Sequence, residues 1–210
     1  MNREKARIEW VLMNMRLSGS SMNEETTSQI AGGQYVLNAT LEEHLLVAGL
    51  TEILPLFEAL LGMGEELCVD TLRKFYKVFS DGKPAVYRKT TPVLFHLSYN
   101  PVLPQEIEEE LSALFRRLYR HPVGNALERA VFVHNELIRI YPFDDCNELV
   151  ARAAMEYELL YQGKFMCPLT LTESEYNSAL AEYMKKGKET AILENLRLNQ
   201  LMVESRVDTL

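Results

Sequence analysis

Ala126–Gly163, which reads ALERAVFVHNELIRIYPFDDCNELVARAAMEYELLYQG, is the stretch that decides the fold. Two sets of apolar residues in it recur at helical spacing: Ala126, Ala130, Val133, Leu137 and Ile140, then Leu149, Ala153, Tyr157 and Leu160. The pattern predicts two buried helices joined by a short turn. Pro142 ends the first helix because it has no N–H group, and Asn147 can cap the second. Such a turn directs the free N–H groups of a helix start at one spot, as in many anion sites.

The run from Ile140 to Arg152, IYPFDDCNELVAR, resembles the signature of Fic (Fido) domains, His-Pro-Phe-x-Asp/Glu-Gly-Asn-Gly/Lys-Arg-x-x-Arg. The matching residues are Pro142, Phe143, Asp145, Asn147 and Arg152. At four positions the sequence differs: Tyr141 replaces the histidine, Cys146 and Glu148 replace the glycines, and Leu149 replaces the first arginine. Fic proteins typically transfer AMP, or another phosphate-containing group, from a nucleotide to a hydroxyl side chain of a target protein. The resemblance implies a mainly α-helical, Fic-type bundle.

The resemblance also implies roles for individual residues, with ATP and Mg²⁺ as the cofactors. Asn147 and Arg152 would contact phosphate, and Asp145 would hold the metal. Tyr141 stands where the family has its catalytic histidine. A tyrosine has a reference pKa near ~10, against ~6.5 for histidine, so it is a poor base at neutral pH. The base is therefore expected to be missing.

Two replacements in the turn oppose nucleotide binding. Cys146 adds a side chain where the backbone must approach phosphate closely, and Glu148 places a negative charge beside the expected anion. Asp145 and Arg152 can equally form an ion pair with each other. Alternatively, the start of the second helix could lower the pKa of the Cys146 thiol and make it reactive, although the charge of Glu148 works against this.

A short helix at about residues 22–32 ends in Thr27–Gly32, TSQIAG, which resembles the inhibitory motif Ser/Thr-x-x-x-Glu-Gly/Asn that precedes many Fic domains. In the family, the glutamate of this motif pairs with the last arginine of the signature and obstructs the nucleotide phosphates. Here the glutamate is replaced by Ala31, which cannot pair with Arg152.

The segment Val86–Tyr99 is rich in residues that favour extended chain, and we expect one small β-hairpin there. It resembles the Gly-x-x-x-Tyr-Arg segment and the "flap" that precede the Fic signature. In the family, the flap holds an extended segment of the target protein by adding a strand to it. The resemblance therefore implies a protein target that docks at about 86–99. The alternative is a lid on the core without partners.

Further helices are predicted on both sides of this region, within a single Fic-like domain spanning residues 1–210. Thr40 and Glu43 form a capping box at the start of a long apolar segment, and Pro55 is expected to kink or split that segment. The other predicted helices are Arg3–Leu17, Val69–Phe79, Pro104–Tyr119, one from Thr172 to about Lys185, and Lys188–Val207.

Composition limits the function. The chain has 210 residues, 47% hydrophobic and 25% charged, with a net charge of -8 and a pI near 5.2. An acidic chain has no basic field for nucleic acid or an anionic membrane, and we expect neither as a partner. No apolar run of ~18 residues is evident in the sequence. Three cysteines without a close-spaced pair fit reduced thiols in a cytoplasmic protein. A homodimer is an open alternative to a monomer.

Three hypotheses follow from these residues. The first is a Fic-fold protein that has lost AMP transfer and acts as a binding or regulatory module. The second is an active transferase of altered chemistry, using Tyr141, Asp145 or Cys146 on a nucleotide or other phosphate-containing donor. The third is a purely structural helical protein without a ligand.

Overall fold

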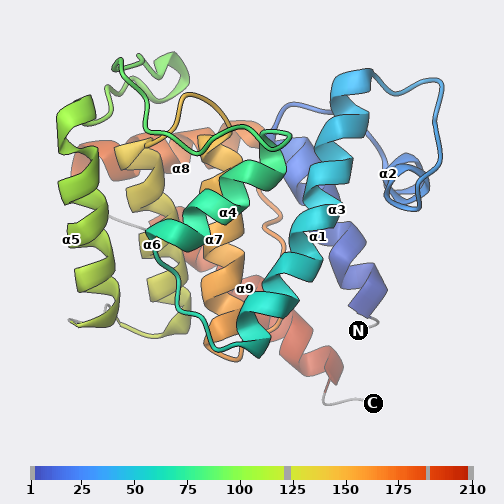
Figure 1. Cartoon of the computed structure of the whole chain (residues 1–210). Coiled ribbons are helices and arrows are strands. Elements are labelled where there is room, and N and C mark those ends of the chain that lie inside the picture. Colours follow the sequence, from blue (N-terminus) through green and yellow to red (C-terminus); the bar gives the residue numbers. More distant parts are fainter. Residues whose placement is uncertain (1–2, 121–123, 188–189, 208–210) are drawn as a thin grey trace.

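The computed structural model describes residues 3–120, 124–187 and 190–207, and these form a mainly α-helical fold (Figure 1). The helices are α1 (Arg3–Leu17), α2 (Glu24–Ala31), α3 (Leu41–Gly62), α4 (Val69–Phe79), α5 (Ile107–Tyr119), α6 (Ala126–Ile140), α7 (Asn147–Tyr161), α8 (Glu173–Lys186) and α9 (Thr190–Val207), with short 3₁₀ turns η1 (Phe95–Leu97) and η2 (Pro104–Glu106).

The helices α6 and α7 form the centre of the fold, as the sequence predicts. They lie side by side in Figure 1 and are joined by the short loop 141–146. Asn125 caps α6 by accepting hydrogen bonds from the N–H groups of Leu127 and Glu128. Every residue of α7 from Val150 to Leu159 is buried, because other helices cover this helix on all sides.

The remaining helices pack around this pair. α4 and α3 contact α7, α5 and α9 contact α6, and α1 contacts α3 and α8. Aromatic rings join three of these elements: Phe57 of α3 lies 5.2 Å from Phe75 of α4 and 5.6 Å from Tyr157 of α7. Edge-to-face pairs of this kind add stability beyond the area that they bury. The core thus holds α7 against both α3 and α4.

Most predicted helix boundaries are confirmed. α1 and α4 have the predicted bounds, and the capping box of Thr40 and Glu43 is present at the start of α3. The helix before Gly32 begins at Glu24, two residues later than predicted, because Asn23 caps it. The last helix is described only from Thr190, since residues 188–189 lie outside the described part of the chain.

The expected break at Pro55 does not occur, and α3 continues through it. Pro55 is exposed, so water can satisfy the carbonyl that loses its N–H donor. Leu54 and Phe57 on the inner face are buried, and their packing compensates for the missing hydrogen bond.

The β-hairpin expected at 86–99 is not confirmed. The structure has irregular chain there, with one antiparallel bridge between Leu94 and Tyr99, and none of the described residues forms a longer strand. The backbone polar groups find other partners: the N–H of Arg88, for example, donates to the carbonyl of Pro142 at 3.0 Å. Leu94 and Leu97 are buried and anchor this flap, as we call residues 86–99, to the core.

α3 is long and apolar enough to cross a membrane, with a mean hydropathy of 1.8, which corrects our statement that no segment reaches this length. Length and composition alone are a weak indication of a membrane span, because core helices meet the same criteria. Here the inner face of α3 packs into the core through side chains such as Leu50, Ile53 and Phe57.

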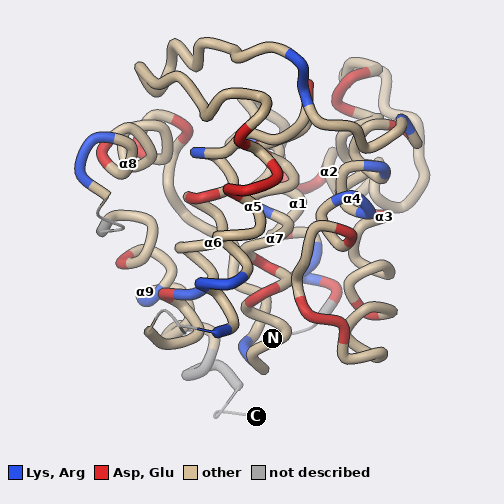
Figure 2. Tube along the Cα trace, turned by 60° about the vertical axis from the view of Figure 1, so that its left-hand side comes forward, with Lys and Arg blue, Asp and Glu red and all other residues tan. Residues whose placement is uncertain are grey.

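Charged positions are interspersed along the chain, and basic positions do not gather on one side in Figure 2. Several ionisable side chains are buried instead. His134 has no exposed surface and lies 2.8 Å from Asn135 and 2.7 Å from the Tyr176 hydroxyl, so it is a hydrogen-bonded core histidine. Burial lowers the pKa of His134 to about 4. Glu158 of α7 pairs with Arg129 of α6 at 2.9 Å.

Glu156 of α7 is the least satisfied of these groups. It is fully buried, its Oε1 accepts one hydrogen bond from the N–H of Cys167 at 3.3 Å, and its Oε2 has no hydrogen-bond partner. Burial raises the pKa of Glu156 to about 8. A carboxyl group in this position is most stable in its neutral form.

We expect Glu156→Gln to stabilise the fold at pH 8 by an amount on the order of a few kcal/mol, and to change little at pH 4.5. The unfolded Glu156 loses its proton near its ordinary pKa, whereas the folded one keeps its proton until about pH 8. Folded wild-type protein therefore loses stability, relative to the variant, as pH rises between these values. Urea unfolding at several pH values measures the difference.

The control is Glu52→Gln, on the exposed side of α3. It should leave the pH dependence unchanged. Comparing variant with wild type is necessary because His134 also makes stability depend on pH. Its folded pKa is lowered, so it makes the fold less stable as pH falls from 6.5 towards 4. A difference between Glu156→Gln and wild type that is constant from pH 4.5 to 8 would refute the assignment.

Candidate functional site

The loop 141–146 turns sharply between α6 and α7 by means of two residues in the left-handed backbone conformation. Tyr141 has φ 51° and Cys146 has φ 56°. Non-glycine residues adopt this conformation at a cost of roughly 1 kcal/mol or more. Cys146 stands where the Fic signature has glycine, so the backbone keeps the shape that glycine favours although the side chain has changed.

Asn147 holds the loop in this shape. It is buried, its Oδ1 accepts from the N–H of Phe143 at 2.9 Å, and its Nδ2 donates to the carbonyl of Phe143 at 2.8 Å. Asn147 is therefore the first residue of α7 and not its cap, which corrects the prediction. Phe143 in turn is buried and stacks on Tyr76 at 4.4 Å. Both polar atoms of Asn147 are thus occupied by the loop itself.

Arg88 ties the flap to the end of α6. The side chain is buried and donates to the carbonyls of Tyr141 (2.6 Å), Thr90 (2.8 Å) and Ile140 (3.1 Å), and also to that of Val102. The last carbonyls of a helix lack intrahelical donors, and a cation is favourable at this end of the helix dipole. Arg88 thus acts as the C-terminal cap of α6.

Tyr141 lies at the end of α6 and is half-buried. Burial, together with the negative charge of nearby Glu148, raises the pKa of the Tyr141 phenol to about 12. At neutral pH an even smaller fraction of Tyr141 is therefore deprotonated, and able to accept a proton, than of a tyrosine in water.

Asp145 pairs with Lys83 and not with Arg152, so the ion pair expected between Asp145 and Arg152 is wrong. Asp145 Oδ2 accepts from Lys83 Nζ at 2.8 Å, and both side chains are partly exposed. Burial acts to raise the pKa of Asp145, but the hydrogen bond from Lys83, with Tyr76 nearby, lowers it below its ordinary value. The carboxylate is therefore ionised and already has a cation beside it.

The Cys146 thiol is not activated. Burial and the adjacent charge of Asp145 raise the pKa of Cys146 to about 11, so the expectation of a lowered pKa is wrong. The Sγ atom lies 3.5 Å from the carbonyl of Phe79. Desolvation outweighs the effect of the helix start, and the thiol stays protonated at neutral pH.

Arg152 is fully buried and held by α1. Its Nε donates to Asn14 at 2.7 Å, and its Nη2 donates to Ser18 at 2.9 Å. Its Nη1 has no hydrogen-bond partner, because Glu148 Oε2 lies 3.7 Å away, a distance that gives only electrostatic attraction. Arg152 thus joins α7 to α1 and leaves only one donor atom on the side of Glu148.

Glu148 lies between the flap and Arg152. Its Oε1 is 3.2 Å from Nε2 of His96, in the flap, and its Oε2 is the carboxylate oxygen closest to Arg152. The Glu148 carboxylate therefore lies beside the start of α7, where an anion is expected. Leu149 is half-buried, and Ala31 is the last residue of α2.

Several residues of the site could not be identified from sequence. Lys83, His96 and Asn14 are far from the loop in sequence and carry no motif that pairs them with Asp145, Glu148 or Arg152. The sequence did contain an indication for Arg88, since this residue follows Tyr87 in the segment that resembles the Tyr-Arg element before the Fic signature.

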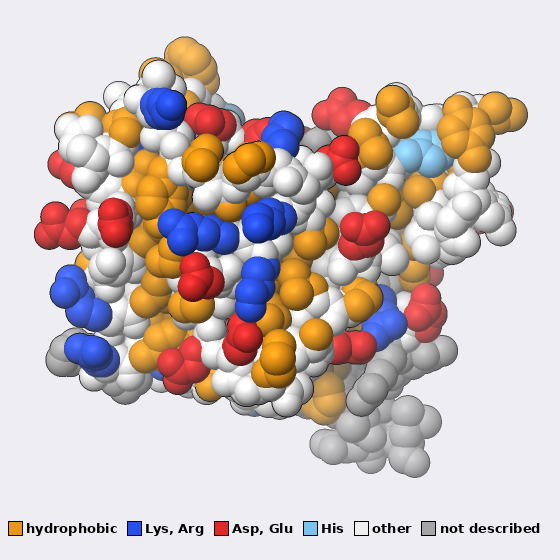
Figure 3. Space-filling view, in the orientation of Figure 1, with side chains coloured by type: hydrophobic (Ala, Val, Ile, Leu, Met, Phe, Trp, Pro, Cys, Tyr) orange, Lys and Arg blue, Asp and Glu red, His pale blue; other side chains and the backbone are white. Residues whose placement is uncertain are grey.

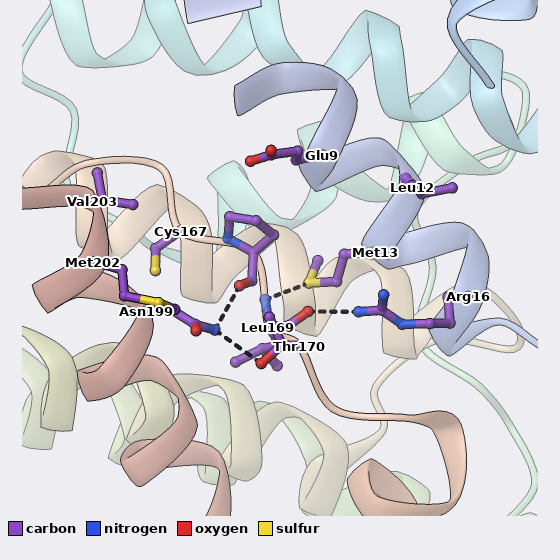
Figure 4. A pocket seen from close by; sticks show the side chains of 11 residues that line it. Glu9, Leu12, Met13, Arg16, Cys167, Leu169, Thr170, Asn199, Met202 and Val203 are labelled. Carbon is purple, nitrogen blue, oxygen red and sulfur yellow. Dashed lines mark hydrogen bonds between the residues drawn. The ribbon is translucent and has the colours of Figure 1, made fainter. Parts of the chain in front are cut away.

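A cavity of about 240 Å³ lies elsewhere, between α1, the segment 167–170 and α9 (Figure 4). Its polar groups already bond to one another: Arg16 donates to the carbonyl of Leu169 at 2.7 Å, and Asn199 donates to that of Pro168 at 3.0 Å. No residue of the loop 141–149 lines this cavity. It is a packing feature that these hydrogen bonds hold together.

The fold is mainly helical and is built on the helix–loop–helix of α6, the loop 141–146 and α7. The Fic/DOC family model matches residues 66–159, from just before α4 to the last turns of α7. The chain therefore contains a Fic (Fido) domain. No curated protein sequence matches the chain significantly.

Solved structures with a similar fold include proteins from three organisms. A fragment of Fic-1 from C. elegans has a TM-score of 0.81 at 21% identity, covering 98% of this chain and 63% of that one. A Fic family protein from Desulfovibrio desulfuricans G20 has a TM-score of 0.77 at 17% identity, covering 97% of this chain and 66% of that one. A Fic domain containing signaling protein from Bacteroides thetaiotaomicron VPI-5482 has a TM-score of 0.74 at 18% identity, covering 96% of this chain and 82% of that one.

These likenesses establish the fold alone, because the identities are low. The chain spans less than two thirds of the length of the C. elegans structure.

We expect iodoacetamide at pH 7.5 to alkylate Cys68 much faster than Cys146, by at least tenfold. Cys68 is exposed, whereas Cys146 is half-buried and has a pKa raised to about 11. Peptide mass spectrometry after timed quenching measures both rates in the same sample. Equal rates would contradict the buried, protonated thiol.

We expect Arg152→Met to destabilise the fold by about 2–4 kcal/mol, because it leaves the Oδ1 atom of buried Asn14 without its hydrogen-bond donor and also removes the hydrogen bond to Ser18. Chemical unfolding measures the loss. The matched control is Arg197→Met, which removes a surface ion pair with Glu128 and should cost less than ~1 kcal/mol. Equal effects in the two variants would show that Arg152 has no structural role.

Proposed function

We propose that this Fic-domain protein does not transfer AMP and acts as a binding or regulatory module. The observation that carries the proposal is that the two charged groups needed for nucleotide transfer are engaged within the chain. Asp145 pairs with Lys83 at 2.8 Å, and Arg152 is buried against Asn14 and Ser18. Each would have to exchange a formed contact for a ligand.

The missing base supports the same proposal. A transferase must remove the proton of the target hydroxyl, and Tyr141, with a pKa near 12, cannot do so at neutral pH. His134 is no substitute, because it is fully buried and bonded to Asn135 and Tyr176. His96 lies in the flap, beside Glu148.

The residues present do not fit a nucleotide phosphate with Mg²⁺. The Lys83 ammonium already neutralises Asp145 through its Oδ2 atom, although Oδ1 has no hydrogen-bond partner, and no cluster of three metal-ligating side chains occurs in the described part of the chain. Glu148 adds a negative charge beside the helix start, and Cys146 adds a side chain to the loop. Repulsion and crowding therefore act together against a polyphosphate.

We propose further that a protein target docks at the flap. Val86, Val93 and Phe95 project from it, and Phe95 is 85% exposed. Exposed apolar side chains beside backbone that lacks strand partners suit an extended segment of a partner, which can pair with the flap and cover these side chains.

The test of lost transfer is a restoration series. Incubation of wild type with labelled ATP and Mg²⁺ should modify neither the protein itself nor proteins of a lysate, and Tyr141→His alone should behave in the same way. The combined variant Tyr141→His, Cys146→Gly, Glu148→Gly and Leu149→Arg should label itself weakly. Glycine suits the positive φ at Cys146, and Leu149 is only half-buried, so the charged end of an arginine there can reach water.

Unfolding curves check that the combined variant is folded. Activity of Tyr141→His alone would show that Glu148 and Cys146 do not block nucleotide binding. Mg²⁺-dependent labelling by wild type, abolished by Asp145→Ala, would favour a transferase of altered chemistry over the proposed module.

A further inference from the structure

A groove with a volume of about 580 Å³ lies between the start of α4 and α5. We call it the α4–α5 groove and define it by Val69, Arg73, Tyr87, Phe115 and Tyr119, together with the residues of α5 that border them. Figure 3 shows apolar side chains gathered in a band between these helices, with basic side chains beside it. None of the loop residues 141–149 lines the groove, so it is separate from the site above.

The walls of the groove are held in place by contacts within the chain. The hydroxyl of Tyr119 accepts a hydrogen bond from the N–H of Leu67 at 2.8 Å. The guanidinium of Arg73 lies 5.5 Å from the centre of the Tyr87 ring and pairs with Asp70 at 3.2 Å. A surface that is already ordered loses little entropy when a partner binds.

Charge is separated along the groove. Arg116 and Arg120, one turn apart near the end of α5, form no ion pair with any described residue. Glu108 lies at the other end of α5. Burial, with the negative charges of Glu108 and Asp70, raises the pKa of the Tyr87 phenol there. Glu158 and Glu66 add negative charge near Tyr119, but Glu158 is buried and paired with Arg129. The groove thus has the two arginines, with Glu66 nearby, at one end, aromatic side chains in the middle, and Glu108 with the Asp70–Arg73 pair at the other end.

We propose that the α4–α5 groove docks a short segment of a partner protein, with an acidic residue at Arg116 and Arg120 and an apolar side chain on Phe115 and Tyr119. From Glu108 to Arg120 the helix rises about 18 Å, the length of five or six extended residues. Arginine and aromatic residues are the side chains that contribute most to protein interfaces. Charge complementarity sets the direction of the segment.

Other ligands fit less well. The acidic side chains Glu66, Asp70 and Glu108 in the lining, on a chain of net charge -8, repel a nucleic acid backbone. A small apolar molecule would leave Arg116 and Arg120 without a partner. The groove also goes beyond the proposed docking at the flap, because it lies mainly on α4 and α5 and shares only Tyr87 with the flap.

The test is selection of peptides from a displayed library of random dodecapeptides on the wild-type protein. We expect enriched sequences that place Asp or Glu next to an aromatic or aliphatic residue. Affinity of a selected peptide should fall at least tenfold in the double variant Arg116→Glu, Arg120→Glu. The matched control is Arg117→Glu, on the same helix, whose guanidinium stacks on Phe132 at 4.7 Å, outside the groove. It should change affinity less than twofold.

Cys68 supplies an independent readout, because it is exposed and lines the groove. A bound peptide should slow its alkylation by iodoacetamide at least threefold. The proposal is overturned if no sequence is enriched, if affinity is insensitive to Arg116 and Arg120, or if Cys68 stays equally reactive. Peptides that instead lose affinity in Phe95→Ala would place docking at the flap, which supports the proposed function and refutes the groove.

Discussion

The burial of α7 from Val150 to Leu159 is the constraint on which the rest of the structure depends. A helix segment that is covered on all sides can carry an ionisable residue only if its charge finds a partner or the group stays neutral, because a buried unpaired charge is costly. Arg152 reaches α1, Glu158 reaches Arg129 of α6, and Glu156, whose pKa is raised to about 8, stays protonated at neutral pH and takes one backbone hydrogen bond. These contacts attach the surrounding helices to the centre, in addition to the apolar packing.

The same constraint decides what the loop can do chemically. Arg152 contributes most of its donors to α1, so only one nitrogen remains towards Glu148. Glu148 and His96 lie at the start of α7, and Lys83 neutralises Asp145. Oppositely charged groups from separate segments thus satisfy one another at the place where a substrate anion would require them.

The loop 141–146 keeps its backbone shape, although the side chains that would perform catalysis are replaced. Cys146 keeps a left-handed backbone without glycine, and Asn147 and Arg88 hold the turn through carbonyl and N–H groups. Backbone hydrogen bonds of this kind do not depend on the side chains that would perform catalysis. The shape therefore persists with Tyr141 in the position of a base that it cannot replace.

The sequence by itself determined the helices and the family resemblance, because helical periodicity and capping residues are local. It predicted the α6–α7 pair and the capping box at Thr40. Only the tertiary structure decided which charges meet, since an ion pair joins segments distant in the chain. Asp145 was expected beside Arg152 and lies beside Lys83. The flap likewise forms no hairpin: the N–H of Arg88 donates to the carbonyl of Pro142 in the loop and the Arg88 side chain donates to the end of α6, so this part of the flap pairs with no second strand.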